Sequence, residues 1–493
     1  MMVMFILSVL VEVVILSHFA RPFRKSLAVL GSVIIGLWSG SLIFEGQQLW
    51  AAGLLIINLF RVINLARIAK GRMHELYLYR TTCRTSLILI GFALLILTMA
   101  RLTSGVNYSD MWLAVTVFQL IAAFIIVATT ARNLYKTKYH PARQFYSDKE
   151  LPTVTVAIPA RNETAELTSC LTSILASDYP KLEVLVLDDC SQDRTSEIIK
   201  AFAQDGVRFV KGTAPRKHWL AKNQAYAQLA EAASGDYIIF CGVDVRFGPA
   251  TVRSLITTLL HKKRRMLSVM PMRFGGGIQT SFIQPLRYWW ELALPRRLFN
   301  RPPVLSTCWL IERKALVSLG GFEAVSHSII PEGYFARELV KEDGYTFIRA
   351  DEDIDVRTVK RPPQQLELAL RTRYPQLRRR PENVLVLLWL ETTLLLGPFM
   401  TITAGFWVGF GLLQYLAGIT SFLLILNHVV IVAGSNPANS VTALFNFPFV
   451  AFTELIVTAV SMYKYEFGNV FWKDRNICIP VMHTIPRLPP MVK

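Results

Sequence analysis

The stretch Glu183-Val-Leu-Val-Leu-Asp-Asp-Cys-Ser-Gln-Asp-Arg-Thr195 decides the fold of the central part of this chain. Its first five residues form a short apolar run, which is typical of a strand buried on both faces. Asp188 and Asp189 follow the run directly, and a helical pattern begins after Ser191-Gln-Asp-Arg-Thr195. The stretch therefore predicts a buried strand that ends in a polar turn and is followed by a helix.

The same unit recurs on both sides of this stretch. Further strands are predicted at 154–158, 207–210 and 237–240, with helical segments between them. Strands that alternate with helices indicate an α/β domain with a mainly parallel sheet and right-handed crossovers. Ligands of such sheets bind at the carboxyl ends of the strands, so the polar residues at those ends are the candidates for function.

Three of those residues are carboxylates, because Asp188, Asp189 and Asp244 each come just after a predicted strand. A carboxylate there can accept hydrogen bonds from a nucleotide or hold a divalent cation beside a diphosphate. The alternative is a structural role, because Asp is common at turns and at helix N-caps. Carboxylates at successive strand ends, followed by Lys222, favour a binding site over three separate caps.

The composition places this domain between membrane segments. Of 493 residues 52% are hydrophobic and 18% are charged, with a net charge of +18 and a mean hydropathy of +0.37, which excludes disordered, collagen-like and disulfide-stapled classes. Residues 131–382 hold 38 of the 53 Lys and Arg and 27 of the 35 Asp and Glu. A charged block between two apolar regions indicates a water-facing domain held by membrane helices.

Apolar stretches long enough to cross a bilayer stand on both sides of the block. The N-terminal ones are 2–20, 27–44, 48–66, 85–100 and 111–130, and the C-terminal ones are 416–433 and 441–462. The segment 384–415 is predicted to break at Gly397-Pro398 into two short helices. Basic residues in alternate links predict an external N-terminus and a cytoplasmic central domain. Glu12, Glu391 and Glu454 lie within or near apolar runs, either as functional groups or as carboxyls bonded to neighbouring helices.

The predicted organisation comprises five transmembrane helices in 1–131, a basic cytoplasmic linker in 132–151, an α/β domain with interfacial helices in 152–382, three to four membrane helices in 383–463 and a cytoplasmic tail in 464–493. The paired Trp289 and Trp290, with basic neighbours, predict a helix at the level of the lipid headgroups, and the alternative is a packed core helix. Six cysteines without a CxxC pair predict free thiols.

The central block resembles the family-2 inverting glycosyltransferases with a GT-A fold, and the resemblance covers about 152–382. The matching motifs are Ala157-Ile-Pro-Ala-Arg-Asn-Glu163, Val186–Thr195, Trp219-Leu-Ala-Lys-Asn223, Gly235–Asp244, Gly320-Gly-Phe322, Pro331-Glu-Gly-Tyr-Phe-Ala-Arg337 and Tyr374-Pro-Gln-Leu-Arg-Arg379. The stretch Arg371–Arg378 looks most like the ceramide- and hopanoid-associated members, which use lipid acceptors.

The resemblance implies a role for each matching residue. Pro159, Ala160, Arg161 and Glu163 would line the nucleotide pocket, Asp189 with Asp188 would contact the base, and Lys222 would lie near the diphosphate. Asp244 would reach a metal ion, Mg²⁺ or Mn²⁺, and Glu332 would be the general base. Gln376 and Arg379 would lie near the acceptor and the leaving group.

Three positions depart from the family pattern. Gly242 replaces the first Asp of the DxD motif, which puts metal dependence in question, Glu332 stands where Asp is usual, and Arg380 replaces a Trp. The resemblance implies an integral-membrane inverting glycosyltransferase that moves a sugar from a UDP- or GDP-sugar to a lipid or lipid-linked acceptor at the cytoplasmic face. The alternatives are a processive polysaccharide synthase and a catalytically silent membrane scaffold. Two basic runs, His261-Lys-Lys-Arg-Arg265 and Arg378–Arg380, are accompanied by no nucleic-acid module.

Overall fold

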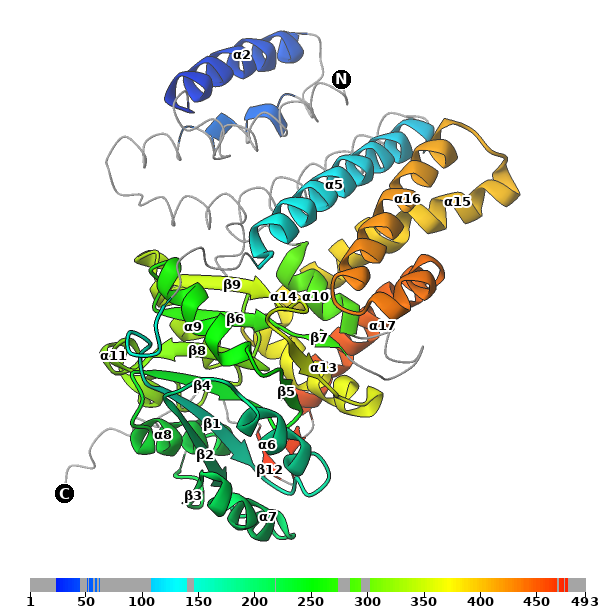
Figure 1. The fold of residues 1–493 in the computed structure, drawn as a ribbon. Helices are drawn as coiled ribbons and strands as arrows, with labels where there is room; N and C mark the ends of the chain where they lie inside the picture. The colour runs from blue at the N-terminus through cyan, green and yellow to red at the C-terminus, as the bar shows by residue number, and fades with distance from the viewer. Residues whose placement is uncertain are drawn as a thin grey trace, which may run out of the picture. The chain divides into compact units, whose positions relative to one another are not determined.

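The computed structural model of the chain describes residues 24–44, 51, 53–55, 58–59, 62, 108–139, 146–217, 219–273, 284–293, 302–467, 470–473 and 475–477 (Figure 1). The chain divides into two compact units. The first comprises Met1–Ile125, Leu294–Arg301 and Met400–Thr420, and the second comprises Ile126–Ala293, Pro302–Phe399 and Ser421–Lys493. All candidate site residues belong to the second unit.

A seven-stranded sheet forms the centre of the second unit. Its strands are β1 (Val154–Ala160), β2 (Leu182–Asp188), β3 (Val207–Lys211), β4 (Tyr237–Cys241), β6 (Met266–Met270), β8 (Cys308–Glu312) and β9 (Tyr345–Arg349). Figure 1 shows them in the order β3-β2-β1-β4-β8-β6-β9. The four predicted strands are parallel neighbours, and only β8 runs antiparallel to the strands beside it. The prediction of a mainly parallel α/β sheet is confirmed.

Helices pack on both faces of this sheet, and its central strands are therefore buried on both sides. The helices are α6 (Leu167–Leu175), α7 (Thr195–Ala201), α8 (Ala221–Ala232), α9 (Thr251–His261), α10 (Gln284–Leu292), α11 (Arg313–Ser318), α12 (Glu332–Lys341) and α13 (Pro362–Gln376), with short 3₁₀ turns at Phe202–Asp205 and Gly321–Val325. On one face Ile239 packs in an apolar core with residues of α6 and α9. On the other, Phe240 stacks on Trp309 at 4.5 Å and meets Tyr226 of α8 at 5.0 Å.

A second, smaller sheet extends the functional edge of the domain. It has the order β5-β10-β7, with β5 at Val245–Phe247, β7 at Met272–Arg273 and β10 at Val356–Thr358. The antiparallel register of β5 and β10 pairs Val245 with Thr358. This pairing brings the residues that follow β10 to Asp244, which directly precedes β5.

Four of the described helical segments are long and apolar enough to cross a membrane, namely Trp112–Thr137, Asn383–Trp407, Leu412–Ala433 and Pro437–Glu466. They correspond to α5 (Tyr108–Thr137), α14 (Pro381–Glu391) with α15 (Gly397–Val408), α16 (Leu412–Ala433), and α17 (Ser440–Phe467) with the 3₁₀ turn Pro437–Asn439 before it. The predicted segments 111–130, 416–433 and 441–462 lie within them. The predicted segment 27–44 lies in α2 (Arg24–Phe44), whereas 2–20, 85–100 and most of 48–66 lie outside the described residues.

The predicted break at Gly397-Pro398 is wrong. A π-helical turn, η4 (Thr392–Leu396), joins α14 to α15, and Gly397 keeps helical backbone angles of φ −50° and ψ −46°. Proline lacks an amide hydrogen and clashes with the carbonyl of the preceding turn. A wider turn just before the proline accommodates both effects. The chain instead leaves the helix at Gly409, which has φ +88°.

The paired tryptophans of α10 pack against protein. Trp289 is 6% exposed, stacks on Phe447 of α17 at 5.4 Å, and donates its indole N–H to Nδ1 of His428 on α16 at 3.2 Å. Trp290 donates to Oε1 of Glu454 on α17 at 3.1 Å. Trp289 is therefore packed as the alternative of a core helix describes, and the position of α10 at the level of the lipid headgroups stays a prediction.

Candidate active site

The carboxyl ends of β1 and β2 meet at one edge of the sheet, where Ala160 pairs with Asp188 in register. Arg161, which follows β1, reaches across this edge and is 9% exposed. Its Nη1 donates to the carbonyl oxygens of Asp189 at 2.7 Å and Cys190 at 2.6 Å. The guanidinium therefore fixes the loop after β2 against the loop after β1, which is the place the nucleotide pocket was predicted to occupy.

The two aspartates after β2 differ in their surroundings. The Asp188 carboxylate accepts the backbone N–H of Ser191 at 3.1 Å, which closes the turn. Asp188 thus performs the capping role that was the structural alternative for it. Asp189 is 3% exposed, and one nitrogen of Arg475, Nη1, donates to both of its carboxylate oxygens, at 2.8 Å from Oδ1 and 2.7 Å from Oδ2. Burial raises the pKa of Asp189, and the Arg475 charge opposes that rise.

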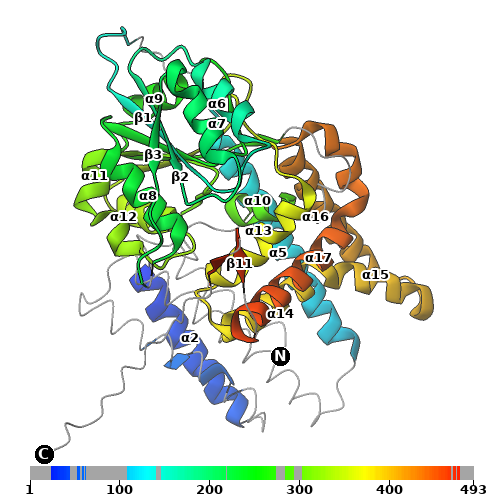
Figure 2. The ribbon, with the colours of Figure 1, turned by 90° about the horizontal axis from the view of Figure 1, so that it is seen from below.

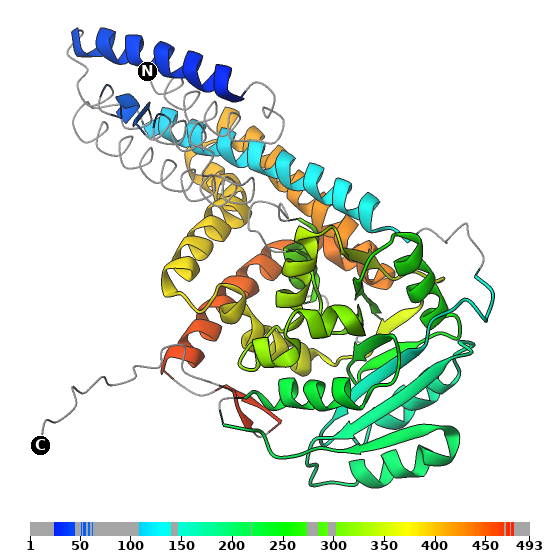
Figure 3. The ribbon, with the colours of Figure 1, turned by 90° about the vertical axis from the view of Figure 1, so that its left-hand side faces the viewer.

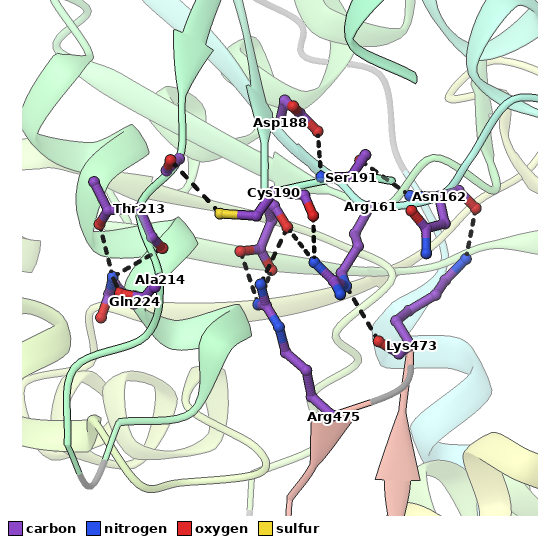
Figure 4. Close-up of polar contacts among 12 residues, drawn as sticks. Arg161, Asn162, Asp188, Cys190, Ser191, Thr213, Ala214, Gln224, Lys473 and Arg475 are labelled. Carbon is purple, nitrogen blue, oxygen red and sulfur yellow. Dashed lines mark hydrogen bonds and ion pairs between the residues drawn. The ribbon is translucent and has the colours of Figure 1, made fainter. Parts of the chain in front are cut away.

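Glu163 has a similar cationic partner. Its Oε1 lies 2.9 Å from Nζ of Lys473, and its backbone N–H donates to Oγ1 of Thr195 at 2.9 Å. Burial raises the pKa of Glu163, against the effect of Lys473. Figure 4 shows Lys473 and Arg475 pointing from the C-terminal tail toward the strand ends. Neither was a sequence candidate, because nothing in the local pattern links the tail to residues about 300 positions earlier.

Asp244 forms the next part of the edge. Its Oδ2 accepts from Oγ1 of Thr358 at 2.9 Å and lies 3.0 Å from Nζ of Lys360. Burial opposes ionisation of this carboxyl, but Lys360 and Thr358 outweigh burial and hold its pKa below the usual value. A Cβ atom on Gly242 would lie 2.7 Å from Oδ1 of Asp244. The glycine therefore leaves the room that the Asp244 carboxylate occupies.

Asp244 is the residue that could hold a divalent cation at this edge. Among the described residues no group of three or more His, Cys, Asp or Glu side chains is arranged to hold a metal ion. Hard cations such as Mg²⁺ take oxygen ligands and often share them between one carboxylate and substrate phosphates. The site fits such an ion only if a bound diphosphate supplies most of the ligands.

Lys222 and Glu332 complete the predicted constellation. Lys222 lies in the first turn of α8, with Nζ 5.1 Å from the centre of the Tyr226 ring. Glu332, the first residue of α12, is 2% exposed. Burial is the largest cause that lowers the pKa of Lys222, Glu332 opposes it, and Arg371, Lys360 and Arg287 act in the same direction as burial, so that the pKa is about 8. The structure therefore brings Lys222 and Glu332 within electrostatic reach of each other and adds three cations that the sequence prediction omitted.

The end of α13 carries the remaining candidates. Gln376 accepts from Nη1 of Arg373 at 3.2 Å, and the Arg379 guanidinium lies 5.1 Å from the centre of the Tyr465 ring of α17. Arg373 is 1% exposed and pairs with Glu454 of α17, with Nη2 3.0 Å from Oε2. Glu454, with Arg373 and Trp290 as partners, fits the structural alternative stated for it.

The described cysteines Cys170, Cys190, Cys241 and Cys308 are free thiols. Burial raises the pKa of Cys170 and of Cys308 to about 12. Neither thiol is therefore a nucleophile near neutral pH.

Comparison with known proteins concerns the part of the chain that carries β1 to β8. Residues 155–320 match the family model described as "Glycosyl transferase family 2". The chain contains a glycosyltransferase family 2 domain. Within it lie the predicted pocket residues from Pro159 to Asp244, while Glu332, Gln376 and Arg379 lie beyond the matched range.

Relatives of the family 2 domain carry glycosyltransferase names. The chain is 28% identical over 185 residues to "Probable glycosyltransferase YdaM" of Bacillus subtilis, covering 36% of this chain and 44% of that protein. It is 32% identical over 135 residues to "4,4'-diaponeurosporenoate glycosyltransferase" of Staphylococcus aureus, covering 26% and 35%. The chain thus spans less than half the length of these curated relatives.

A solved structure also resembles the chain. A mannosyltransferase from Pyrobaculum calidifontis, in complex with GDP-Man and Mn²⁺, superposes with a TM-score of 0.44 at 16% identity. The match covers 72% of this chain and 97% of that one.

Proposed function

We propose that this protein is an integral-membrane, inverting glycosyltransferase that moves a sugar from a UDP- or GDP-sugar to a lipid or lipid-linked acceptor at the cytoplasmic face, with the N-terminus outside. The observation that carries the proposal is the electrostatic coupling of Lys222 to Glu332 and to Lys360, which lies 3.0 Å from Asp244, in a chain whose residues 155–320 match family 2. An anionic donor, a cationic cradle and a buried carboxylate are what a displacement at an anomeric carbon requires.

Each residue then has a chemical task. Glu332 takes the proton of the acceptor hydroxyl. At the same time the hydroxyl oxygen of the acceptor forms a bond to the anomeric carbon, and the bond from that carbon to the phosphate oxygen of the donor breaks. Lys222, with the Arg371 and Arg287 charges beside it, stabilises the nucleoside diphosphate that leaves. A Mg²⁺ or Mn²⁺ ion held by Asp244 would neutralise part of the diphosphate charge. A single displacement inverts the configuration of the sugar.

The lipid acceptor is supported by how the site joins the apolar helices. Arg287 lies on α10 and Arg371 on α13, and these two helices bind α17 through Trp290 and Arg373. The cations around Glu332 are therefore attached to a helix long and apolar enough to cross a membrane. An acceptor anchored in a bilayer would approach the site from this side.

The test is turnover by the purified full-length protein in detergent. UDP- and GDP-sugars are supplied with and without the lipid fraction of the host, and products are read by mass spectrometry. We expect single addition to a lipid, lost by at least about a hundredfold in Glu332→Gln, since general base catalysis contributes 10²–10⁴. Asp244→Asn should lose most of the activity, and removal of divalent cations from the wild type with a chelator should cause a similar loss. Glu312→Gln, at the far end of β8, is the matched control.

Other outcomes identify the alternatives. A ladder of product masses would indicate a polysaccharide synthase. The silent scaffold is favoured by Gly242 and by the ion pair between Asp244 and Lys360. The scaffold alternative would be established if the wild type neither hydrolyses a nucleotide sugar nor transfers its sugar to any acceptor. Turnover that survives both Glu332→Gln and Asp244→Asn would refute the site assignment.

A further inference from the structure

The chain returns to the family 2 domain after α17 as a short hairpin, shown in red in Figure 3. Its strands are β11 (Phe471–Trp472) and β12 (Arg475–Asn476), which pair antiparallel. Val470 and Ile477 flank the hairpin and pack in an apolar cluster with Tyr374 of α13 and Tyr465 of α17. The two ends of the hairpin are thus anchored, and its turn extends beyond that anchor.

The hairpin also contacts α13 directly. The guanidinium of Arg371 lies 5.6 Å from the centre of the Trp472 ring, and Figure 2 shows β11 beside α13. Arg371 is one of the cations that depress the pKa of Lys222. The hairpin therefore lies beside the cationic part of the site as well as beside the strand ends.

The turn of the hairpin holds three residues that the family resemblance assigns to the nucleotide. Arg475 binds both carboxylate oxygens of Asp189, Lys473 pairs with Glu163, and the carbonyl oxygen of Lys473 accepts from Nε of Arg161 at 3.1 Å. Lys473 Nζ also donates to the carbonyl oxygen of residue 162 at 3.1 Å. A base that bound Asp189 would need the position that the Arg475 guanidinium holds.

The burial of these pairs decides how they compete with a ligand. The Asp189 side chain is 4% exposed and that of Arg475 is 18% exposed, whereas Glu163 and Lys473 are 26% and 29% exposed. Because the Asp189 side chain is almost fully buried beneath the Arg475 guanidinium, a nucleotide base would have to displace that guanidinium to reach the carboxylate oxygens. The contact is nevertheless reversible, because two-residue strands are marginal by themselves and the second pair, Lys473 with Glu163, is partly exposed to water and therefore weak.

We propose that residues 470–473 and 475–477 form a plug that closes the donor site of this protein and that the nucleotide displaces during each cycle. The inference rests on the proposed function, since the displaced contacts are those of the donor base. When only the unplugged fraction binds, the apparent dissociation constant rises by the reciprocal of that fraction. Occupancy of the plug therefore sets the apparent affinity for the donor.

The test is binding of UDP and of GDP alone to the full-length protein in nanodiscs, measured by calorimetry. Arg475→Ala should tighten binding by up to about tenfold if the plug is closed nine-tenths of the time. Lys473→Ala should tighten it less, and Arg475→Lys should remain near the wild type. Arg208→Ala removes another partly exposed ion pair, with Glu183 at 2.7 Å, and should change nothing.

Hydrogen exchange of the folded protein provides a second readout that does not depend on a variant. Amides in residues 470–473 and 475–477 should exchange faster when UDP or GDP is bound, because the turn is released. Slower exchange with nucleotide, together with weaker binding by Arg475→Ala, would show that the hairpin completes the pocket and would overturn the plug.

The two hypotheses fail in different ways. If the wild type binds nucleotide and Asp189→Asn weakens binding while Arg475→Ala leaves it unchanged, the plug is refuted and the proposed function stands. If neither the wild type nor Arg475→Ala binds any nucleoside diphosphate, the proposed function is refuted, and the plug with it.

Discussion

Raising the pH above about 8 should weaken donor binding through Lys222. Burial lowers the pKa of this lysine from 10.5 to about 8, with Arg371, Lys360 and Arg287 in the same direction and Glu332 opposed. The charged fraction is then about 90% at pH 7 and about 10% at pH 9. Because the ammonium attracts the diphosphate, the association constant should fall about tenfold for each pH unit above 8.

The measurement is the dissociation constant of UDP or GDP between pH 6.5 and 9.5, at constant ionic strength. In kinetics, kcat/KM should begin to fall near pH 8, because this ratio reports the ionisation of the free enzyme. The fall of kcat should begin at a higher pH, because a bound diphosphate favours the charged form of the lysine. The dissociation constant of Lys222→Arg should not rise in this pH range, since arginine stays charged. A wild-type profile flat to pH 9.5, or an unchanged loss of binding with pH in Lys222→Arg, would refute the reasoning.

Three further predictions concern packing around the site. Gly242→Ala places a Cβ atom 2.7 Å from Oδ1 of Asp244, so turnover should fall several-fold while the melting temperature stays within about 2 °C of the wild type; unchanged turnover would contradict it. Glu454→Gln leaves the charge of Arg373 buried without its counter-ion, so unfolding in detergent should cost about 3–5 kcal/mol less, and a loss below about 1 kcal/mol would be inconsistent with a buried pair. Gly235→Ala places a Cβ atom 2.7 Å from a backbone nitrogen of β1 and should destabilise the domain by about 1–3 kcal/mol, as measured by thermal unfolding. Gly206→Ala is the reference, because Gly206 has a positive φ and open space around it, so that this substitution adds backbone strain without a clash.

Periodicity and turn residues predicted the parallel half of the sheet, because apolar runs such as 183–187 are buried locally and end in polar turns. The antiparallel strand β8 and its neighbours β6 and β9 were not predicted. Their pairing depends on contacts across long sequence separations, such as Cys241 with Cys308, and no short motif encodes such a contact.

The candidate site divides in the same way. Asp189, Glu163 and Asp244 were identified because they follow strands or match family motifs, but their cationic partners were not. Lys360 reaches Asp244 only through the pairing of β10 with β5, and Arg475 reaches Asp189 only because the tail folds back. Residue type and position predict which groups stand at an edge, whereas tertiary contacts decide which of them are available to a ligand.

The contacts that Glu454 makes with Arg373 and with Trp290 have a practical consequence for producing a water-soluble form of this protein. A chain cut after α13 would keep every strand of the family 2 domain, yet it would leave a buried guanidinium without its carboxylate and two tryptophan rings without their helix. The smallest portion that satisfies its own buried charges therefore includes α17. A water-soluble version should require Arg373 and Trp290 to be redesigned together, not merely the removal of the apolar helices.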